Sequence, residues 1–258
     1  MEQIIYKVDA FTGKLFSGNP AAVCPLENWL DDKLMQNIAA ENNLSETAFF
    51  VKNNNHYDIR WFTPEMEVDL CGHATLASSF VYFNFIDKNA TRIVFQSKSG
   101  ELIVEKENDL ISLNFPTQKP LPVDAPQQNI LNMFQVKPLE VLMGIKNFLV
   151  FDSEKVVRNI KPDFPLLRKI EGDGVIVTAR GDRVDFVSRY FCADIGEDPV
   201  TGSAHTHLIP YWSEKLNRKK LTASQVSARG GELFCEDLGD RVKISGRAVL
   251  YSVGKIYI

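Results

Sequence analysis

The stretch EVDLCGHATLASSFVYF, residues 67–83, sets Cys71, Gly72 and His73 directly before a long apolar run. The run from residue 73 to about residue 82 predicts a helix that is apolar on nearly all sides, and such a helix must be surrounded by other elements. The segment before it is open to three interpretations. Cys71 can be a nucleophile, or Cys71 and His73 can be half of a metal site. Alternatively, the backbone N–H groups at Gly72 and His73 can begin a helix that binds an anion.

A second copy of this segment lies further along the chain. CGHATLASSFVY (71–82) aligns with TGSAHTHLIPYW (201–212), and GELIVEKENDLISL (100–113) aligns without gaps with GELFCEDLGDRVKI (231–244). The two offsets, 130 and 131 residues, differ by one, as a single loop insertion would produce. The chain is therefore predicted to be duplicated, each half holding strands, one apolar helix and then a hairpin.

The remaining patterns divide the chain near its middle. Residues 31–43 have helical periodicity, and the Pro-rich segment 115–126 predicts a linker because proline continues neither a helix nor a strand. We expect two domains, 1–115 and 116–258, with the last strand free to return to the first domain. Short alternating or apolar runs predict strands at residues 4–11, 46–52, 57–62, 91–96, 101–107 and 110–115.

The composition excludes several classes of protein. The 258 residues are 45% hydrophobic and 24% charged, which is typical of a soluble globular protein with a large core. A net charge of −4 without a basic block argues against nucleic acid as a partner. No apolar run reaches the roughly 18 residues of a membrane span, and the N-terminus lacks the basic start of a signal peptide. Four widely spaced cysteines without a CxxC pair predict reduced thiols in the cytoplasm.

Four motifs carry a resemblance to a known family. FSGNPAAVC (16–24), NLSETAFF (43–50), RWFTPEMEVDLCGHATLAS (60–78) and GEDPVTGSAH (196–205) resemble the PhzF-like family, the phenazine-biosynthesis isomerases and their relatives. The resemblance implies the α+β fold of diaminopimelate epimerase: two pseudo-symmetric domains, each a barrel-like, mostly antiparallel sheet wrapped around a central helix. It also implies an active site in the cleft between the domains, a homodimer, and no metal or organic cofactor.

Glu46 is the predicted catalytic residue. Taken alone it reads as a surface carboxylate at the start of a strand, but Ala48 and Phe50 share its strand face, so it projects from an apolar row. Partial desolvation would raise the pKa of such a carboxyl group toward the range of a proton shuttle. The resemblance assigns to Glu46 general acid/base catalysis, in which it takes a proton from one substrate carbon and returns it to another.

Both helix starts are predicted to bind substrate. Gly72 and Gly202 leave backbone N–H groups open to a carboxylate, although glycine with Thr or Ser is also an ordinary helix cap. Asp198, before a proline, reads as a turn residue, and His73 reads as a hydrogen-bond donor at a helix start. The resemblance makes both of them substrate-binding or proton-handling groups, joined by Ser203, with Ser45 orienting Glu46.

The cysteine and metal interpretations are weaker. An epimerase of this fold needs an acid and a base on opposite faces of the substrate carbon, and Thr201 stands where a second thiol would pair with Cys71. We therefore expect Cys71 to be a packed small side chain. Cys71 and His73 are two residues apart, as are His205 and His207, and such spacings diverge on a helix. We expect no metal site.

These observations predict a cofactor-independent isomerase that moves a proton on a small carboxylate-bearing metabolite. If the substrate is that of the family's named member, it is trans-2,3-dihydro-3-hydroxyanthranilate. Two alternatives stay open: an amino-acid epimerase or racemase of the same fold, and a non-catalytic protein that binds a small molecule.

Overall fold

The computed structural model describes residues 2–193 and 195–258, and the chain divides into two compact units. Unit 1 comprises residues 1–114 and 245–258, and unit 2 comprises residues 115–244. The predicted division lay after residue 115 and left the place of the last strand open. That strand, β18 (Ala248–Tyr257), belongs to unit 1, where it pairs antiparallel with β1 (Glu2–Ala10).

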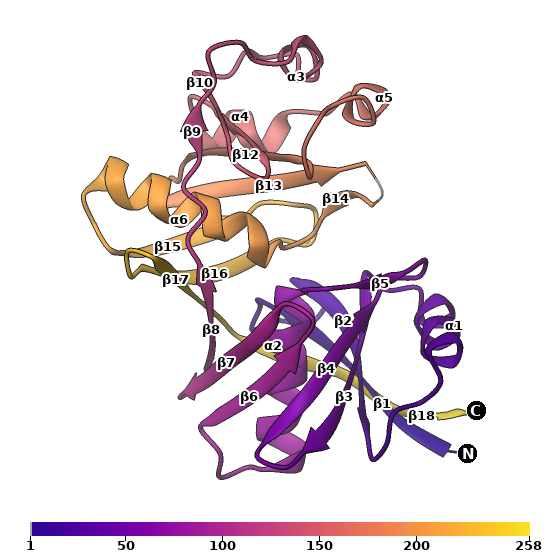
Figure 1. Cartoon of the computed structure of the whole chain (residues 1–258). Helices are drawn as coiled ribbons and strands as arrows, with labels where there is room; N and C mark the ends of the chain where they lie inside the picture. Colours follow the sequence, from indigo (N-terminus) through magenta and orange to yellow (C-terminus); the bar gives the residue numbers. More distant parts are fainter. Residues whose placement is uncertain (1, 194) are drawn as a thin grey trace. The chain divides into compact units, whose positions relative to one another are not determined.

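Unit 1 is a sheet wrapped around one helix (Figure 1). The helix α2 (Gly72–Val81) is buried on nearly all sides and contacts β1, β18, β2 and β3. A second helix, α1 (Asp32–Asn42), packs on the outer face of β3 and β4, and a single π-helical turn (Tyr82–Ile86) follows α2. The other strands are β2 (Asn19–Leu26), β3 (Glu46–Asn53), β4 (His56–Phe62), β5 (Glu67–Val68), β6 (Arg92–Ser97), β7 (Gly100–Glu107) and β8 (Leu110–Pro116).

Small hydroxyl residues allow α2 to be buried without leaving polar groups unsatisfied. The side chains of Thr75, Ser78 and Ser79 donate to the carbonyl oxygens four residues earlier, at 2.5, 2.7 and 2.8 Å. Each hydroxyl is thus satisfied within the helix, which removes the cost of an unpaired polar group in the core. The predicted helix from residue 73 to about 82 agrees with this element to within one residue.

Unit 2 repeats this arrangement with α6 (Gly202–Leu216) in the place of α2. Its strands are β9 (Leu121–Pro122), β10 (Glu140–Met143), β11 (Asn147–Val150), β12 (Val175–Arg180), β13 (Phe186–Cys192), β14 (Gly196–Asp198), β15 (Lys220–Gln225), β16 (Gly231–Asp237) and β17 (Arg241–Gly246). Three short helices, α3 (Gln128–Asn132), α4 (Glu154–Asn159) and α5 (Phe164–Leu167), contribute to a core cluster over β11, β12 and β13.

The strand pairings of the two units match. β3–β4 and β12–β13 are antiparallel, β4–β6 and β13–β15 are parallel, and β6–β7 and β15–β16 are antiparallel. The prediction of an α+β fold with two pseudo-symmetric, mostly antiparallel sheets around central helices is confirmed. The strand β2, which the sequence patterns left unassigned, lies between β1 and β3.

A proline inside α6 costs the helix one hydrogen bond, which another segment replaces. Pro210 has no N–H to donate to the carbonyl oxygen of Thr206, four residues earlier. That oxygen instead accepts from the backbone N–H of Gln118 at 3.1 Å. The start of the Pro-rich segment is therefore fixed to the middle of α6.

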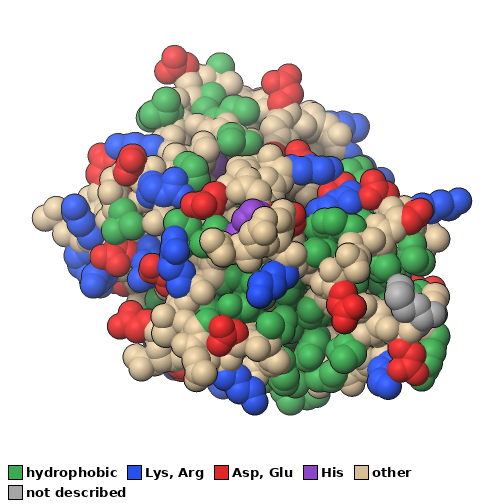
Figure 2. Space-filling view, turned by 60° about the horizontal axis from the view of Figure 1, so that its bottom comes forward, with side chains coloured by type: hydrophobic (Ala, Val, Ile, Leu, Met, Phe, Trp, Pro, Cys, Tyr) green, Lys and Arg blue, Asp and Glu red, His purple; other side chains and the backbone are tan. Residues whose placement is uncertain are grey.

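One face of unit 1 is apolar and exposed. Tyr251, Val253 and Tyr257 alternate along β18 and are 55%, 51% and 76% exposed. Ile4 on the paired strand β1 extends this face, and the ring of Phe16 stands 5.9 Å from that of Tyr251. Figure 2 shows a broad area of hydrophobic side chains on the side that it presents. Among the described residues, no helix is both long enough and apolar enough to cross a membrane.

Candidate active site

The side chains of Glu46 and His73 meet at the start of α2. Glu46 is the first residue of β3, and Ala48 and Phe50 on the same strand face are fully buried, so the carboxylate ends an apolar row. Its Oε2 lies 3.1 Å from Nε2 of His73, an ion-pair contact in which neither atom is aligned for a hydrogen bond. The Glu46 side chain is 18% exposed and that of His73 only 6%.

Asn19 completes this group, and the sequence patterns did not single it out. Its side-chain amide nitrogen is 3.2 Å from Nδ1 of His73, and its amide oxygen accepts from Ser45 Oγ at 3.4 Å. With the oxygen engaged by Ser45, the amide nitrogen faces Nδ1, and Nε2 of the same ring faces Glu46. Ser45, predicted to orient Glu46, contacts Asn19, which in turn contacts His73.

The only sequence signal for Asn19 was its place in the motif FSGNPAAVC. Gly18 before it has φ +68°, and a Cβ at this position would collide with the carbonyl oxygen of Ala10. Glycine is therefore required for the loop to approach β1. Pairing of Asn19 with Ala10, and of Ala21 with Glu46, then sets Asn19 and Glu46 on neighbouring strands.

The charges around His73 and Cys71 fix their protonation. Burial disfavours the charged imidazole, but the adjacent Glu46 carboxylate outweighs burial and holds the pKa of His73 well above 6.5. Burial, followed by the Glu46 charge, raises the pKa of the Cys71 thiol to about 11. Cys71 is 6% exposed and therefore a packed thiol rather than a thiolate at neutral pH.

Glu46, Cys71 and His73 are also the one group within the described ranges that could hold a metal ion, with their ligand atoms all within 4.8 Å of one another. The expectation that Cys71 and His73 diverge was wrong, because Cys71 precedes the helix and its Sγ lies 3.5 Å from Nδ1 of His73. The imidazole, however, turns Nδ1 to the thiol and Nε2 to the carboxylate. A single ion bound to one nitrogen would require another side chain to move, so the arrangement suits proton transfer better.

The start of α2 lacks a conventional side-chain cap. Gly72 is the first helical residue, and the N-cap Cys71 makes no side-chain hydrogen bond to the helix. The first backbone N–H groups of a helix have no partner within it, and the helix dipole adds positive charge there. The Ala74 N–H contacts the Cys71 side chain, and the positive end of the helix favours an anion at this place.

Asp198 and Thr201 are held together in unit 2 by a buried glutamine. Thr201 Oγ1 donates to Asp198 Oδ2 at 2.5 Å. Gln225, fully buried at the end of β15, donates to the Asp198 carbonyl oxygen at 2.8 Å and to Thr201 Oγ1 at 3.1 Å. Its own side-chain oxygen accepts from the Thr201 backbone N–H at 2.9 Å. No motif marked Gln225, because it lies 27 and 24 residues from its partners.

Gly202 begins α6 as Gly72 begins α2, again after an N-cap without a side-chain hydrogen bond, and Ser203 beside it is exposed. Further along α6, His205 Nδ1 lies 2.8 Å from the Thr201 carbonyl oxygen, so Nδ1 carries the proton and Nε2 is a buried lone pair. Burial lowers the pKa of His205 to about 4. This histidine is a neutral core residue.

The carboxylate of Glu46 has no counterpart in unit 2. Thr47 faces Phe62 in unit 1, and Val175 faces Phe191 at the matching place in unit 2. Gly174 therefore occupies the position that Glu46 holds in unit 1. Of the two equivalent positions in the duplicated fold, one holds glutamate and the other holds glycine.

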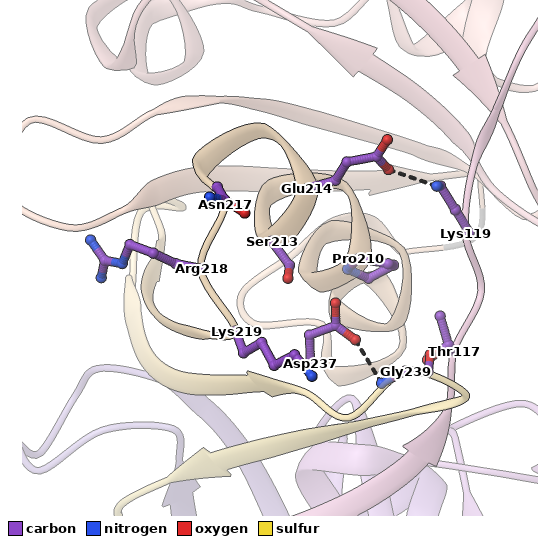
Figure 3. Close-up of a pocket in the computed structure, with 10 residues that line it drawn as sticks. All are labelled: Thr117, Lys119, Pro210, Ser213, Glu214, Asn217, Arg218, Lys219, Asp237 and Gly239. Carbon is purple, nitrogen blue, oxygen red and sulfur yellow. Dashed lines mark hydrogen bonds and ion pairs between the residues drawn. The ribbon is translucent and has the colours of Figure 1, made fainter.

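Unit 2 also has a groove of about 560 Å³ that involves none of the predicted site residues. Figure 3 shows it beside the second half of α6, with Lys119 ion-paired to Glu214 at 2.6 Å. Its lining combines Lys119, Arg218 and Lys219 with Glu214 and Asp237.

Comparison with known proteins decides the family. The model of the PhzC-PhzF family, described as phenazine biosynthesis-like protein, matches residues 8–254. The chain belongs to this family. It is 48% identical, over all of both chains, to an uncharacterized isomerase of Pseudomonas aeruginosa, and 38% identical to a human phenazine biosynthesis-like domain-containing protein, covering 99% of each.

Comparison with solved structures supports the same family assignment. A PhzF-family protein of Enterococcus faecalis superposes with a TM-score of 0.97 at 49% identity over all of both chains. A hydroxyproline epimerase of Agrobacterium vitis matches with a TM-score of 0.61 at 8% identity, over 99% of this chain and 92% of the epimerase, which shows a shared fold alone. The prediction of a PhzF-like isomerase is confirmed at the level of the family.

Proposed function

We propose that this PhzF-family member is a cofactor-independent isomerase in which Glu46 moves a proton between two carbons of a small carboxylate-bearing metabolite. The observation that carries the proposal is the 3.1 Å contact between Glu46 and His73 beside the start of α2. A base at the end of an apolar row, next to a helix start that can hold an anion, has the parts that such a reaction needs.

In the proposed step, the Glu46 carboxylate takes a proton from a substrate carbon, and the electron pair of the broken C–H bond moves into the unsaturated system of the substrate. Glu46 is then a neutral carboxylic acid, which exchanges its proton with solvent and delivers a proton to another carbon, so that deuterated water labels the product. His73 supplies a positive or hydrogen-bonding group while the substrate holds the extra charge. Hydrogen is neither gained nor lost, so no oxidant or reductant enters.

We assign substrate binding to the N–H groups at Gly72 and to Asp198, Gly202 and Ser203. Asp198 is 7% exposed and its carboxylate orientation is set by Thr201. Gly202 begins α6 as Gly72 begins α2, and neither helix has a side-chain cap bond. Trans-2,3-dihydro-3-hydroxyanthranilate is the first substrate to test.

The test follows solvent deuterium by NMR. The candidate substrate is supplied in deuterated water to wild type, to Glu46→Gln and to Glu41→Gln, a matched change at an exposed glutamate of α1. We expect deuterium at the isomerised carbon with wild type and Glu41→Gln, and a loss of at least about 10³-fold with Glu46→Gln. Equal exchange in all three proteins would remove Glu46 as the acid/base.

An amino-acid epimerase is the first alternative. It would need a second acid/base group, but Thr201 already donates to Asp198, Gly174 lies where unit 2 would need a glutamate, and the Cys71 pKa is about 11. Racemisation of a panel of free amino acids would support the alternative. A non-catalytic binding protein would show a thermal shift with the carboxylate and no turnover.

We also propose that two copies associate through the apolar face of β1 and β18. Large apolar side chains that are more than half exposed at residues 251, 253 and 257, interrupted on this face by Lys255, are typical of an interaction surface. Light scattering should give twice the chain mass for wild type and the single mass for Tyr251→Glu/Val253→Glu. Leu121→Glu, at a residue 63% exposed in unit 2, is the matched control. The four free thiols are consistent with a reducing, cytoplasmic location.

A further inference from the structure

A bidentate Arg–Glu ion pair of nearly the same geometry is found among the described residues of each unit. In unit 1, Arg60 donates from Nε and Nη2 to the two carboxylate oxygens of Glu67 at 2.7 and 2.8 Å. In unit 2, Arg189 donates from the same atoms to Glu197 at 2.6 and 2.9 Å. All four side chains are largely buried, with exposed fractions between 12% and 22%. Such a planar, two-bond contact fixes orientation as well as distance.

The two pairs occupy equivalent positions in the duplicated fold. Glu67 faces Phe62 across β4 and β5, and Glu197 faces Phe191 across β13 and β14. In each unit the arginine lies two residues before that phenylalanine, and the glutamate lies four residues before the N-cap of the central helix. The sequence repeat therefore extends to these residues, which the motif alignment had not paired.

The place of each pair suggests what it does. β5 has two residues and β14 has three, so few ladder hydrogen bonds hold either strand. Each of these strands leads directly into a helix start, at Gly72 or Gly202. We infer that Arg60–Glu67 and Arg189–Glu197 are positioning pairs that fix the two helix starts. This role rests on the proposed function of those helix starts in binding substrate.

The contacts outside each pair support an anchoring role. Arg189 also donates from Nη1 to the carbonyl oxygens of Val157 and Ile160, at 3.1 and 2.8 Å, which ties β13 to the end of α4. Arg60 donates from Nη1 to Asp32 at 2.7 Å, but Asp32 is 76% exposed. An exposed ion pair adds little, so in unit 1 the bond to Glu67 carries the effect.

Hydrogen exchange measured by mass spectrometry tests the inference without depending on catalysis. The Thr75 N–H donates to the Cys71 carbonyl oxygen at 3.1 Å and is the first bonded amide of α2. Arg60→Lys keeps the charge but cannot form the two parallel bonds. We expect it to raise exchange in residues 75–78 on the order of tenfold and to leave residues 205–208 unchanged. Arg189→Lys should do the reverse.

Two control variants separate positioning from general stability. Asp32→Asn removes the charge of the exposed partner of Arg60, and Arg218→Lys weakens the ion pair of Arg218 with Asp185, 3.0 Å long and at the opposite end of α6 from Gly202. Neither should change exchange at the helix starts. In an assay with a substrate that the wild type converts, Arg60→Lys and Arg189→Lys should each also lower kcat/KM about 10- to 100-fold. If an arginine variant fails to fold, the glutamate of the same pair is replaced instead. Glu67→Gln or Glu197→Gln keeps the side-chain size, and we expect the same local rise in hydrogen exchange.

Unchanged exchange at the helix starts, or an equal rise in both units from either variant, would overturn the inference. The proposed function can fail separately. If the exchange changes are confined as expected but wild type and Glu46→Gln incorporate equal deuterium, the positioning role stands and the assignment of Glu46 falls.

Discussion

Asn19 and His73 are 54 residues apart in the chain, and their side chains meet at 3.2 Å inside unit 1. Asn19 is fully buried and His73 is 5% exposed, so neither has water as a ready substitute partner. The contact decides which way the imidazole ring faces, and with it which nitrogen is turned to Glu46. In the proposed mechanism, the orientation of His73 therefore depends on a residue that does not itself move a proton.

Replacing Asn19 should impair catalysis more than folding. Asn19→Leu keeps the side-chain size but removes the amide partner of Nδ1 and leaves only the longer contact with Cys71, so the ring can rotate away from Glu46. We expect kcat to fall about 10- to 100-fold, with a smaller change in KM. Asn42→Leu is the control, because it loses a 3.2 Å bond to Thr47 in the same unit but none at the site. Equal kinetics for the two variants would contradict the role of Asn19.

Cys71 should be slow to react with thiol reagents. Its pKa of about 11 leaves almost no thiolate at pH 8, and it is buried, whereas Cys192 is half-buried. Under native conditions iodoacetamide should label Cys192 first, and this labelling should leave activity unchanged. The order of labelling is read by mass spectrometry. Early labelling of Cys71 with complete inactivation would favour the epimerase alternative.

His205 should make the protein less stable in mild acid. Its pKa in the folded chain, about 4, is below the usual 6.5, so below pH 6.5 the unfolded chain binds a proton that the folded chain does not. The stabilising effect is complete above pH 6.5 and is lost as the pH falls toward 4. Urea unfolding at pH 7.5 and 5.0 should show a smaller difference for His205→Leu than for wild type.

The two central helices should contribute similarly to stability. Leu76 in α2 and Leu208 in α6 are both fully buried. Truncation to alanine leaves a cavity and should cost about 2–5 kcal/mol of unfolding free energy at either position. Leu121→Ala, at a residue 63% exposed, should cost less than about 0.5 kcal/mol. The values come from urea denaturation, and a cost below about 1 kcal/mol at either helix would contradict the surrounded-helix core.

Several features of the site could be predicted because their signals are local. The apolar run after residue 72 predicts a buried helix, a two-residue period places Glu46 beside buried residues, and glycine at residues 72 and 202 marks the helix starts. The duplication was visible because equivalent structures keep similar spacing. The ion pairs of Arg60 and Arg189 could have been found in the same way, because RWF (60–62) and RYF (189–191) are separated by nearly the same number of residues as the other repeated segments.

The sequence alone determined the family, the duplicated α+β fold and the two glycine-led helices, because these follow from motifs and periodicities between neighbouring residues. Only the tertiary structure decided that Cys71 and His73 converge, that Asn19 faces Nδ1 of His73, and that Gln225 ties Asp198 to Thr201. Such contacts depend on side-chain directions from elements brought together by strand pairing. Spacing along the chain does not encode those directions.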